Sequence, residues 1–216
     1  MSDFVLDWER EKRTGVAEAV LCEGKSVAQI EGILGEAGER RLLLTRLDEE
    51  RHAKLTANVR TTIDYDPLSR TAFHGSPRSP AIEGAGIVCA GTSDLPVARE
   101  AARSLQFAGY AAPVIADVGV AGLWRLMKRL DEIRAFKVVI AVAGMEGALF
   151  SVIAGLVEAP VIAVPTSVGY GVAQGGHVAL NSALATCATG VVAVNIDNGY
   201  GGACAAIRIL KRAAAS

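Results

Sequence analysis

The sequence predicts an α/β protein in which a small, mainly helical α+β unit precedes a five-stranded parallel sheet with helices on both faces. Near Gly84, charged and helix-rich sequence gives way to apolar runs that alternate with glycine-rich turns. Five of these runs are rich in β-formers, and strands buried on both faces of a parallel sheet are continuously apolar. The Pro- and Ser-rich loop Gly75–Pro80 is the expected linker, which gives units at residues 1–80 and 81–216.

The N-terminal unit is expected to contain helices, one strand and a hairpin. Ser26 is a favourable N-cap because its hydroxyl accepts a hydrogen bond from a free N–H group of the first helical turn. The predicted elements are helices at Val5–Glu23, Ser26–Glu36 and Asp48–Ala57, a strand at Leu42–Thr45, and a hairpin of Thr61–Ile63 with Thr71–His74 around Asp66-Pro67.

The second half alternates strands and helices. The predicted strands are Gly86–Ala90, Pro113–Asp117, Lys137–Val142, Val161–Val164 and Val191–Val194. The predicted helices are Leu95–Ala108, Ala121–Phe136, Ala148–Val157, Gly176–Thr186 and Gly202–Arg212. Alternation of this kind favours the flavodoxin-like strand order 2-1-3-4-5.

Composition narrows the classes of function. The 216-residue chain is 51% apolar and 21% charged with a formal net charge of −1, which is typical of a globular protein and does not indicate a nucleic-acid surface. Met1–Arg13 lacks the apolar segment of a secretory signal, and Glu146 and Glu158 interrupt the apolar run Val138–Val164. The four cysteines form no CxxC pair. We expect a cytoplasmic protein with free thiols and no nucleic-acid or membrane partner.

Ligands of open parallel sheets bind beyond the carboxyl ends of the strands. The loops there contain the candidate substrate-binding residues Thr92, Ser93, Asp94, Asp117, Gly144, Met145, Thr166, Ser167, Asn195, Asp197 and Asn198. Gly91–Asp94 precedes a helix whose N-terminus favours a phosphate, although simple capping by Ser93 or Asp94 explains the same residues. Asn195–Gly202 is either a second phosphate cradle or a glycine-rich turn.

Two side chains near these loops are candidates for chemistry. Glu146 lies between glycines at a strand end, where it is either a general acid or base or a partner of the next helix dipole. Considered without homology, Cys89, Cys187 and Cys204 are expected to be buried small apolar residues. The predicted helix end at Cys187 disfavours a thiolate. The three histidines have no metal-ligand spacing, and His177 lies near the predicted loops.

The strand-end motifs resemble the LarB family, whose C-terminal half is related to PurE, the aminoimidazole ribonucleotide carboxylase. The matching stretches are AGTSDLPVAREA, DVGVAGLWRL, VAGMEGALFSVIAGL, VPTSVGYG and VVAVNIDNGYG, with EAVLCEGK and YDPLSRTA in the N-terminal unit. The resemblance covers most of the chain. It implies a PurE-like catalytic domain and a homo-octamer or another homo-oligomer.

The resemblance also implies an activity. LarB-like enzymes begin synthesis of the nickel-pincer cofactor of lactate racemase. They add a carboxylate from CO2 or bicarbonate to C5 of the nicotinate ring of nicotinic acid adenine dinucleotide and split its phosphoanhydride, which yields pyridinium-3,5-biscarboxylic acid mononucleotide and AMP. The family cysteine corresponds to Cys187 and the acidic residue of the MEG motif to Glu146, while Ser93 and Asp94 correspond to the ribose-phosphate pair of PurE-like enzymes.

Some features keep alternatives open. Phosphoanhydride hydrolysis makes Mg²⁺ a plausible cofactor, with Asp94, Asp117 and Asp197 as candidate ligands. Phe150 and His177 depart from the usual family residues, and the second and third loops lack the histidines of PurE. The alternatives are a PurE-type carboxylase of aminoimidazole ribonucleotide and a non-catalytic nucleotide-binding module.

Overall fold

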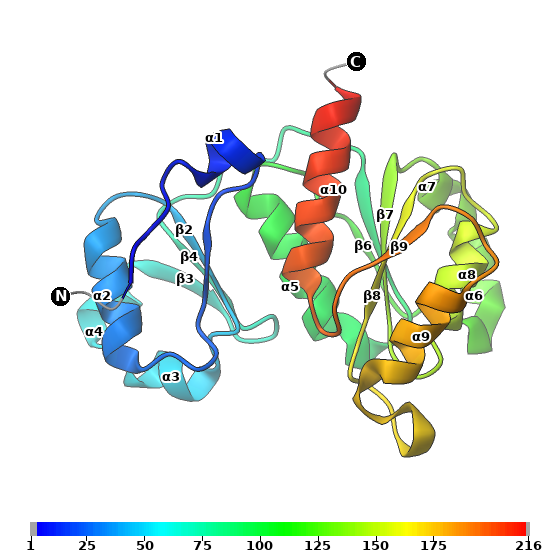
Figure 1. The fold of residues 1–216 in the computed structure, drawn as a ribbon, viewed down its shortest axis with the longest axis horizontal. Helices are drawn as coiled ribbons and strands as arrows, with labels where there is room; N and C mark the ends of the chain where they lie inside the picture. Colours follow the sequence, from blue (N-terminus) through cyan, green and yellow to red (C-terminus); the bar gives the residue numbers. More distant parts are fainter. Residues whose placement is uncertain (1–3, 215–216) are drawn as a thin grey trace.

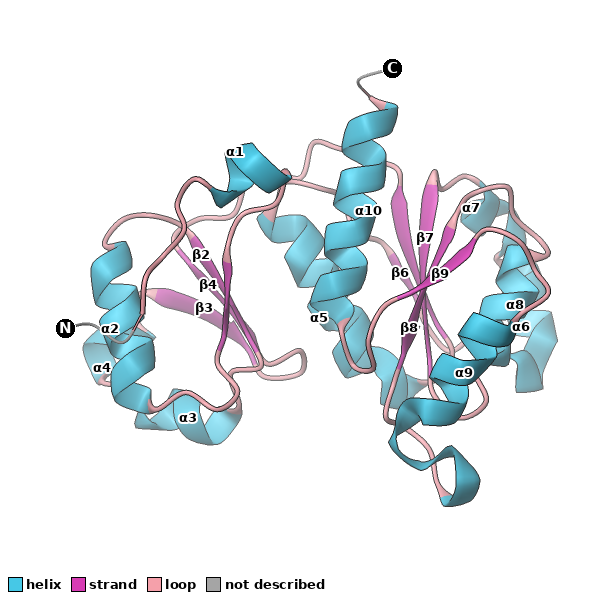
Figure 2. Cartoon of the chain, in the orientation of Figure 1, coloured by secondary structure: helices cyan, strands magenta, loops and turns pink. Residues whose placement is uncertain are grey.

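The computed structural model describes residues 4–214. Their strands form two sheets, one of four strands and one of five, and helices α5 (Leu95–Phe107) and α10 (Gly199–Ala213) lie between the two (Figures 1 and 2). The fold is therefore α/β, as the sequence predicts. No helix in the described part of the chain is both long enough and apolar enough to span a membrane.

The N-terminal unit contains a small mixed sheet in the order β1-β2-β4-β3, in which β1 and β2 are parallel and the other pairs antiparallel. Its strands are β1 (Ala19–Leu21), β2 (Leu42–Thr45), β3 (Ile63–Asp66) and β4 (Thr71–His74). Its helices are α1 (Arg10–Thr14), α2 (Val27–Ala37), α3 (Glu49–Lys54) and α4 (Ala57–Arg60). Residues of α2 and of the sheet, Ile30, Leu34 and Leu44 among them, form its core.

The predicted long helix Val5–Glu23 is wrong. α1 ends at Gly15, which adopts a left-handed φ of 81°, and the following Ala19–Leu21 segment pairs with β2. The helical pattern does not decide the structure here. Gly15 ends the helix, and Ala19–Leu21 gains backbone hydrogen bonds by pairing with β2. By contrast, the Ser26 cap is confirmed: its hydroxyl accepts from the Gln29 N–H group at 3.2 Å in a capping box.

The C-terminal domain is an all-parallel sheet in the order β6-β5-β7-β8-β9, which confirms the predicted order 2-1-3-4-5. The strands are β5 (Ala85–Cys89), β6 (Val114–Ile115), β7 (Val138–Ala143), β8 (Val161–Pro165) and β9 (Val191–Ala193). The further helices are α6 (Leu123–Lys128), α7 (Leu130–Arg134), α8 (Ala148–Ala154) and α9 (His177–Ala185), with short 3-10 turns η1 (Thr92–Asp94), η2 (Val120–Gly122) and η3 (Gly171–Gly176).

Each face of the large sheet has its own apolar core. α5 and α10 cover one face with residues such as Leu105 and Ile207, and α6 to α9 cover the other with Leu126, Ile133 and Phe150. The predicted helix Ala121–Phe136 is two helices that meet at Arg129. Burial on both faces explains why the central strands are continuously apolar.

The N-terminal unit packs on the outer side of α5 and α10. Leu43 of β2 and Phe73 of β4 form a small apolar cluster with Phe107, and the Phe73 and Phe107 rings lie 5.5 Å apart. Arg41 donates to the Phe107 carbonyl at 3.1 Å, and buried Arg103 of α5 donates to the Asp64 carbonyl at 2.7 Å. These contacts fix the small unit against α5.

Candidate active site

Asp94 ties three of the strand-end loops together. Its carboxylate accepts hydrogen bonds from the Gly91 N–H group at 3.0 Å, from the Thr166 hydroxyl at 2.6 Å, and from the Gly144 N–H group. The residue is 4% exposed, and burial raises its pKa even though the Thr166 and backbone hydrogen bonds oppose this. Both carboxylate oxygens are thus occupied within the protein, so the Asp94 side chain organises the loops after β5, β7 and β8.

Asp197 makes a second connection, between the loops after β8 and β9. Its carboxylate accepts from the Ser167 N–H group at 2.8 Å, and its own N–H group donates to the Pro165 carbonyl at 2.8 Å. Beside them, a Cβ atom on Gly144 would lie 2.1 Å from the Val168 carbonyl oxygen, so only glycine permits the close approach of the β7 and β8 loops. The predicted loops therefore do meet at one edge of the sheet.

A cleft of about 460 Å³ opens between these loops and the N-terminal unit; we call it the interdomain cleft. Ser93, Ser167 and Asp197 line one wall. The other wall belongs to the N-terminal unit and includes Arg46 and Arg70. Its volume is in the usual range for small-molecule sites. Ser93, Ser167 and Asp197 are thus the predicted binding residues that reach this space.

Strained backbone is concentrated around the same edge. Five non-glycine residues in the described chain have positive φ, and all lie in loops or turns next to strand ends: Arg46, Arg70, Asp117, Met145 and Asp197. A left-handed non-glycine residue costs free energy and is commonly found at functional sites. This distribution points to the strand-end edge independently of any motif.

Glu146 lies in the loop after β7 and is exposed. Met145 before it has a φ of 51°, and Gly147 after it has a φ of 64° and serves as the N-cap of α8. The carboxylate is therefore held at the tip of a tight turn. A single copy of the chain therefore leaves this carboxylate in contact with solvent.

Cys187 is exposed, which corrects the expectation of a buried small residue drawn without homology. It follows α9, whose preceding Gly176 lies against the Thr166 carbonyl at the strand-end edge. A nine-residue helix is about 13 Å long. Cys187 therefore lies beyond the far end of α9 from the loops, and the neighbouring Thr186 hydroxyl bonds the Ser151 hydroxyl at 2.7 Å.

The other three thiols are also free: Cys22 and Cys89 are buried, and Cys204 is partly buried. Burial raises the pKa of both Cys22 and Cys89 to about 12, which keeps these thiols protonated. Among the four cysteines, Cys187 alone is exposed to solvent.

The β9–α10 loop is explained mainly by packing. Asn198 caps α10 by accepting from the Gly201 N–H group at 2.7 Å, and the Asn195 side chain accepts from the Ile196 N–H group. A Cβ atom on Gly199 would lie 2.3 Å from the Val97 carbonyl, and one on Gly202 would lie 2.8 Å from Val164. These contacts favour the glycine-rich turn, which allows close helix packing, over a second phosphate cradle.

The predicted metal ligands do not form a cluster. Residues 4–214 contain no group of three or more His, Cys, Asp and Glu side chains arranged to hold a metal ion. Asp117 is in an ion pair with Arg125, and Asp94 is saturated by protein donors. Mg²⁺ remains a prediction, and we assign no reaction step to it.

Glu100 is a buried carboxyl group that the sequence did not single out. It lies on α5 at the interdomain cleft and accepts from the N–H groups of Tyr200 and Gly199 at the start of α10. Burial raises its pKa from 4.5 to about 7, against the opposing effects of the Arg46 charge and these backbone hydrogen bonds. The group is therefore half protonated near neutral pH in the folded protein.

We expect the Glu100 carboxyl group to make stability fall with rising pH. Between pH 4.5 and about 7 the unfolded chain loses this proton and the folded protein retains it, so unfolding becomes easier by up to about 3 kcal/mol. Glu100→Gln should remove this part of the slope, as measured by urea unfolding at about pH 5 and about pH 8. Exposed Glu36→Gln is the control, and identical slopes for both variants would contradict the assignment.

Comparisons with known proteins agree with this architecture. Residues 2–76 match the model of the LarB/PurE-like N-terminal domain, and residues 85–216 match that of AIR carboxylase. The chain belongs to the LarB family. An uncharacterized protein of Methanocaldococcus jannaschii is 38% identical over 206 residues, which cover 91% of this chain and 79% of that protein. The LarB family assignment makes this a carboxylase-type enzyme.

Sequence reasoning missed what the LarB-type N-terminal domain contributes to the site. Arg46, Arg51, Arg70 and Glu23 all line the interdomain cleft. One signal was present: the stretches EAVLCEGK and YDPLSRTA, which resemble the family, contain Glu23 and Arg70. Nothing in their local pattern, however, indicated that they meet the strand-end loops.

Proposed function

We propose that this protein carboxylates C5 of the nicotinate ring of nicotinic acid adenine dinucleotide and hydrolyses its phosphoanhydride, giving pyridinium-3,5-biscarboxylic acid mononucleotide and AMP. The observation that carries the proposal is the pairing of a LarB-type N-terminal domain with an AIR carboxylase domain. The N-terminal domain supplies a wall of the interdomain cleft, and a carboxylase of a single mononucleotide has less need of that added wall.

The proposed chemistry begins with a thiolate. A pyridinium ring is electron-poor, so C5 cannot attack CO2 directly. Addition of the Cys187 sulfur to the ring forms a C–S bond, neutralises the ring charge and makes C5 enamine-like. C5 then forms a bond to the carbon of CO2. A base removes the C5 proton, and the C–S electron pair returns to sulfur as the thiolate leaves and aromaticity is restored.

Glu146 is the proposed base. Its carboxylate is exposed at the tip of the β7 loop, so it is free to approach a ring bound at the strand ends. Ser93 and Ser167 are the proposed substrate-binding residues. Both line the interdomain cleft beside the loops that Asp94 holds together. Their hydroxyl groups are suitable partners for ribose and phosphate oxygens.

The position of Cys187 favours an oligomeric active site. Its thiol and the strand-end loops of one chain are separated by the length of α9, so we propose a homo-oligomer in which a neighbouring copy brings its Cys187 to the loops. Large apolar side chains are exposed on the same part of the chain, Tyr170 at 78%, Val172 at 94% and Leu184 at 70%. Surfaces of this kind often mark protein–protein contacts. A homo-octamer is one arrangement that meets this requirement.

A substrate comparison tests the proposal. The protein is incubated with isotopically labelled bicarbonate and either nicotinic acid adenine dinucleotide or aminoimidazole ribonucleotide, and the products are identified by mass spectrometry. We expect label in the pyridinium mononucleotide together with AMP. Label in the imidazole product alone would overturn the proposal in favour of a PurE-type carboxylase. Tight dinucleotide binding with neither label nor AMP would indicate a binding module.

A further inference from the structure

The interdomain cleft reaches beyond the Ser93 loop to the N-terminal unit. It extends from Ser93 and Pro96, at the start of α5, to the tip of the β3–β4 hairpin, where Leu68 and Arg70 line it. Its volume of about 460 Å³ is within the range of small-molecule sites. A ligand seated on the Ser93 loop would thus continue toward the N-terminal unit.

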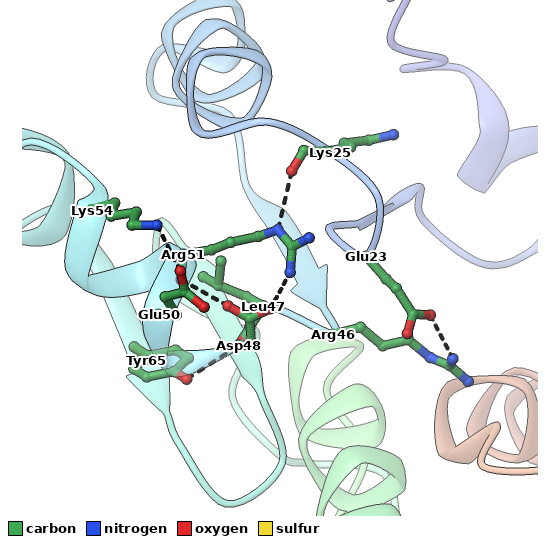
Figure 3. A network of polar contacts seen from close by, with 9 residues as sticks. All are labelled: Glu23, Lys25, Arg46, Leu47, Asp48, Glu50, Arg51, Lys54 and Tyr65. Atoms are coloured by element: carbon green, nitrogen blue, oxygen red, sulfur yellow. Dashed lines mark hydrogen bonds and ion pairs between the residues drawn. The ribbon is translucent and has the colours of Figure 1, made fainter.

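Three arginines of the N-terminal unit line this end of the cleft, and two of them form ion pairs within that unit (Figure 3). Arg46 pairs with Glu23 at 2.8 Å and donates to the Asp197 carbonyl at 3.0 Å. Arg51 pairs with Asp48 and donates to the Lys25 carbonyl at 3.1 Å. Each therefore has its charge balanced by a carboxylate of the same unit.

Arg70 differs from these two. Its guanidinium is exposed at the cleft and makes no hydrogen bond or ion pair with any residue between 4 and 214. The Arg51 N–H group and, less strongly, the Arg70 charge lower the pKa of Asp48, but the Asp48 carboxylate is bonded to Arg51 and not to Arg70. The cleft thus presents one guanidinium whose donors are free of direct protein contacts, and such donors are suited to a phosphate oxygen.

The backbone that carries Arg70 is strained and fixed. Arg70 has a φ of 53°, and its carbonyl accepts from the Leu47 N–H group at 2.8 Å, directly after Arg46, which has a φ of 52°. On the other side of the turn, Asp66 accepts from Ser69 and from Arg99 of α5 at 3.2 Å. The hairpin tip is therefore locked to both domains, and Arg70 is presented without the ordering cost of a flexible loop.

We propose that the interdomain cleft binds the adenylate half of the dinucleotide and that Arg70 is the ligand of its phosphate. This inference rests on the proposed function and deepens it, since it gives the N-terminal unit a role. The ring half lies at the strand-end loops, and the AMP half lies between those loops and the β3–β4 hairpin. The unit thereby makes the enzyme select a dinucleotide over a nicotinate mononucleotide.

Calorimetric titrations with AMP, nicotinic acid mononucleotide and the dinucleotide test this, using the full-length protein. Arg70→Met keeps an unbranched, flexible side chain but removes the guanidinium and its charge. We expect it to weaken AMP and dinucleotide binding by about tenfold or more and mononucleotide binding by less than about twofold. Arg70→Lys should recover part of the loss. Arg60→Met, in α4 outside the cleft, is the matched control and should change none of the three.

The outcomes separate the two proposals. Unchanged AMP and dinucleotide affinity in Arg70→Met, or an equal loss for the mononucleotide, would overturn the cleft assignment even if carboxylation is observed. Failure of the wild-type protein to bind AMP or the dinucleotide would also overturn it. AMP binding that depends on Arg70, together with no carboxylation of the dinucleotide, would leave the cleft assignment standing and reject the proposed function.

Discussion

Cys187→Ala is expected to reduce ring carboxylation by about 10³-fold or more while dinucleotide affinity changes little. The reason is chemical: without sulfur addition the ring stays aromatic and positively charged, and C5 does not attack CO2. The thiol is exposed and takes no part in the apolar core, so its removal should leave folding intact. Carboxylation is measured as labelled product, and affinity by titration.

Cys204→Ala is the matched control, because it removes a thiol from the body of α10 and should retain carboxylation. A Cys187→Ala variant that still carboxylates would reject the thiolate mechanism. Mixing Cys187→Ala with Glu146→Gln protein under conditions that exchange subunits extends the test. If a neighbouring copy supplies the thiol, some sites recover both groups and activity returns; no recovery would place both groups in one chain.

Gly144→Ala is expected to have the second large effect. Its Cβ atom would meet the Val168 carbonyl oxygen at 2.1 Å and the Thr166 hydroxyl at 2.7 Å. These are atoms of the adjacent loop, and the Thr166 hydroxyl is also the donor to Asp94. The loops must separate, so we expect a loss of about 3 kcal/mol in unfolding free energy and a fall in activity of about 100-fold or more.

Gly155→Ala provides the comparison for Gly144→Ala. Gly155 ends α8 with a φ of −78°, and the nearest atoms to its Cβ position are at 3.6 Å and beyond. Alanine there should be neutral or slightly stabilising because it restricts the unfolded chain. Urea unfolding of both variants checks the contrast. Equal stability of the two would show that the β7 and β8 loops tolerate separation.

Much of the fold followed from local patterns. Apolar runs long enough for buried strands, separated by helical stretches, were sufficient for the parallel sheet and its order. The Ser26 cap could be predicted because a capping box joins residues only three positions apart in the sequence. The prediction of a Val5–Glu23 helix was wrong because Ala19–Leu21 pairs with Leu43–Thr45, some twenty residues further along the chain.

The candidate site was likewise predicted only in part. The general rule for strand ends was enough to select the loops, since the carboxyl ends of parallel strands share one edge. The rule did not predict that the Asp94 carboxylate holds these loops together, because the partners of Asp94, Thr166 and Gly144, are distant from it in the sequence. The sequence did place Cys187 near the end of the helix before the fifth strand, and the structure has it just after α9.

By itself, then, the sequence determined the alternation of strands and helices, the loops that meet at one edge of the sheet, and the family to which the motifs belong. Only the tertiary structure decided that the β3–β4 hairpin faces that edge across a cleft and that the Arg70 guanidinium lies there without a direct ion pair among residues 4–214. Hydrophobic periodicity and capping act over a few residues. The packing of the N-terminal unit on α5 and α10 joins residues such as Arg46 and Asp197, 151 positions apart, and no local pattern encodes such a contact.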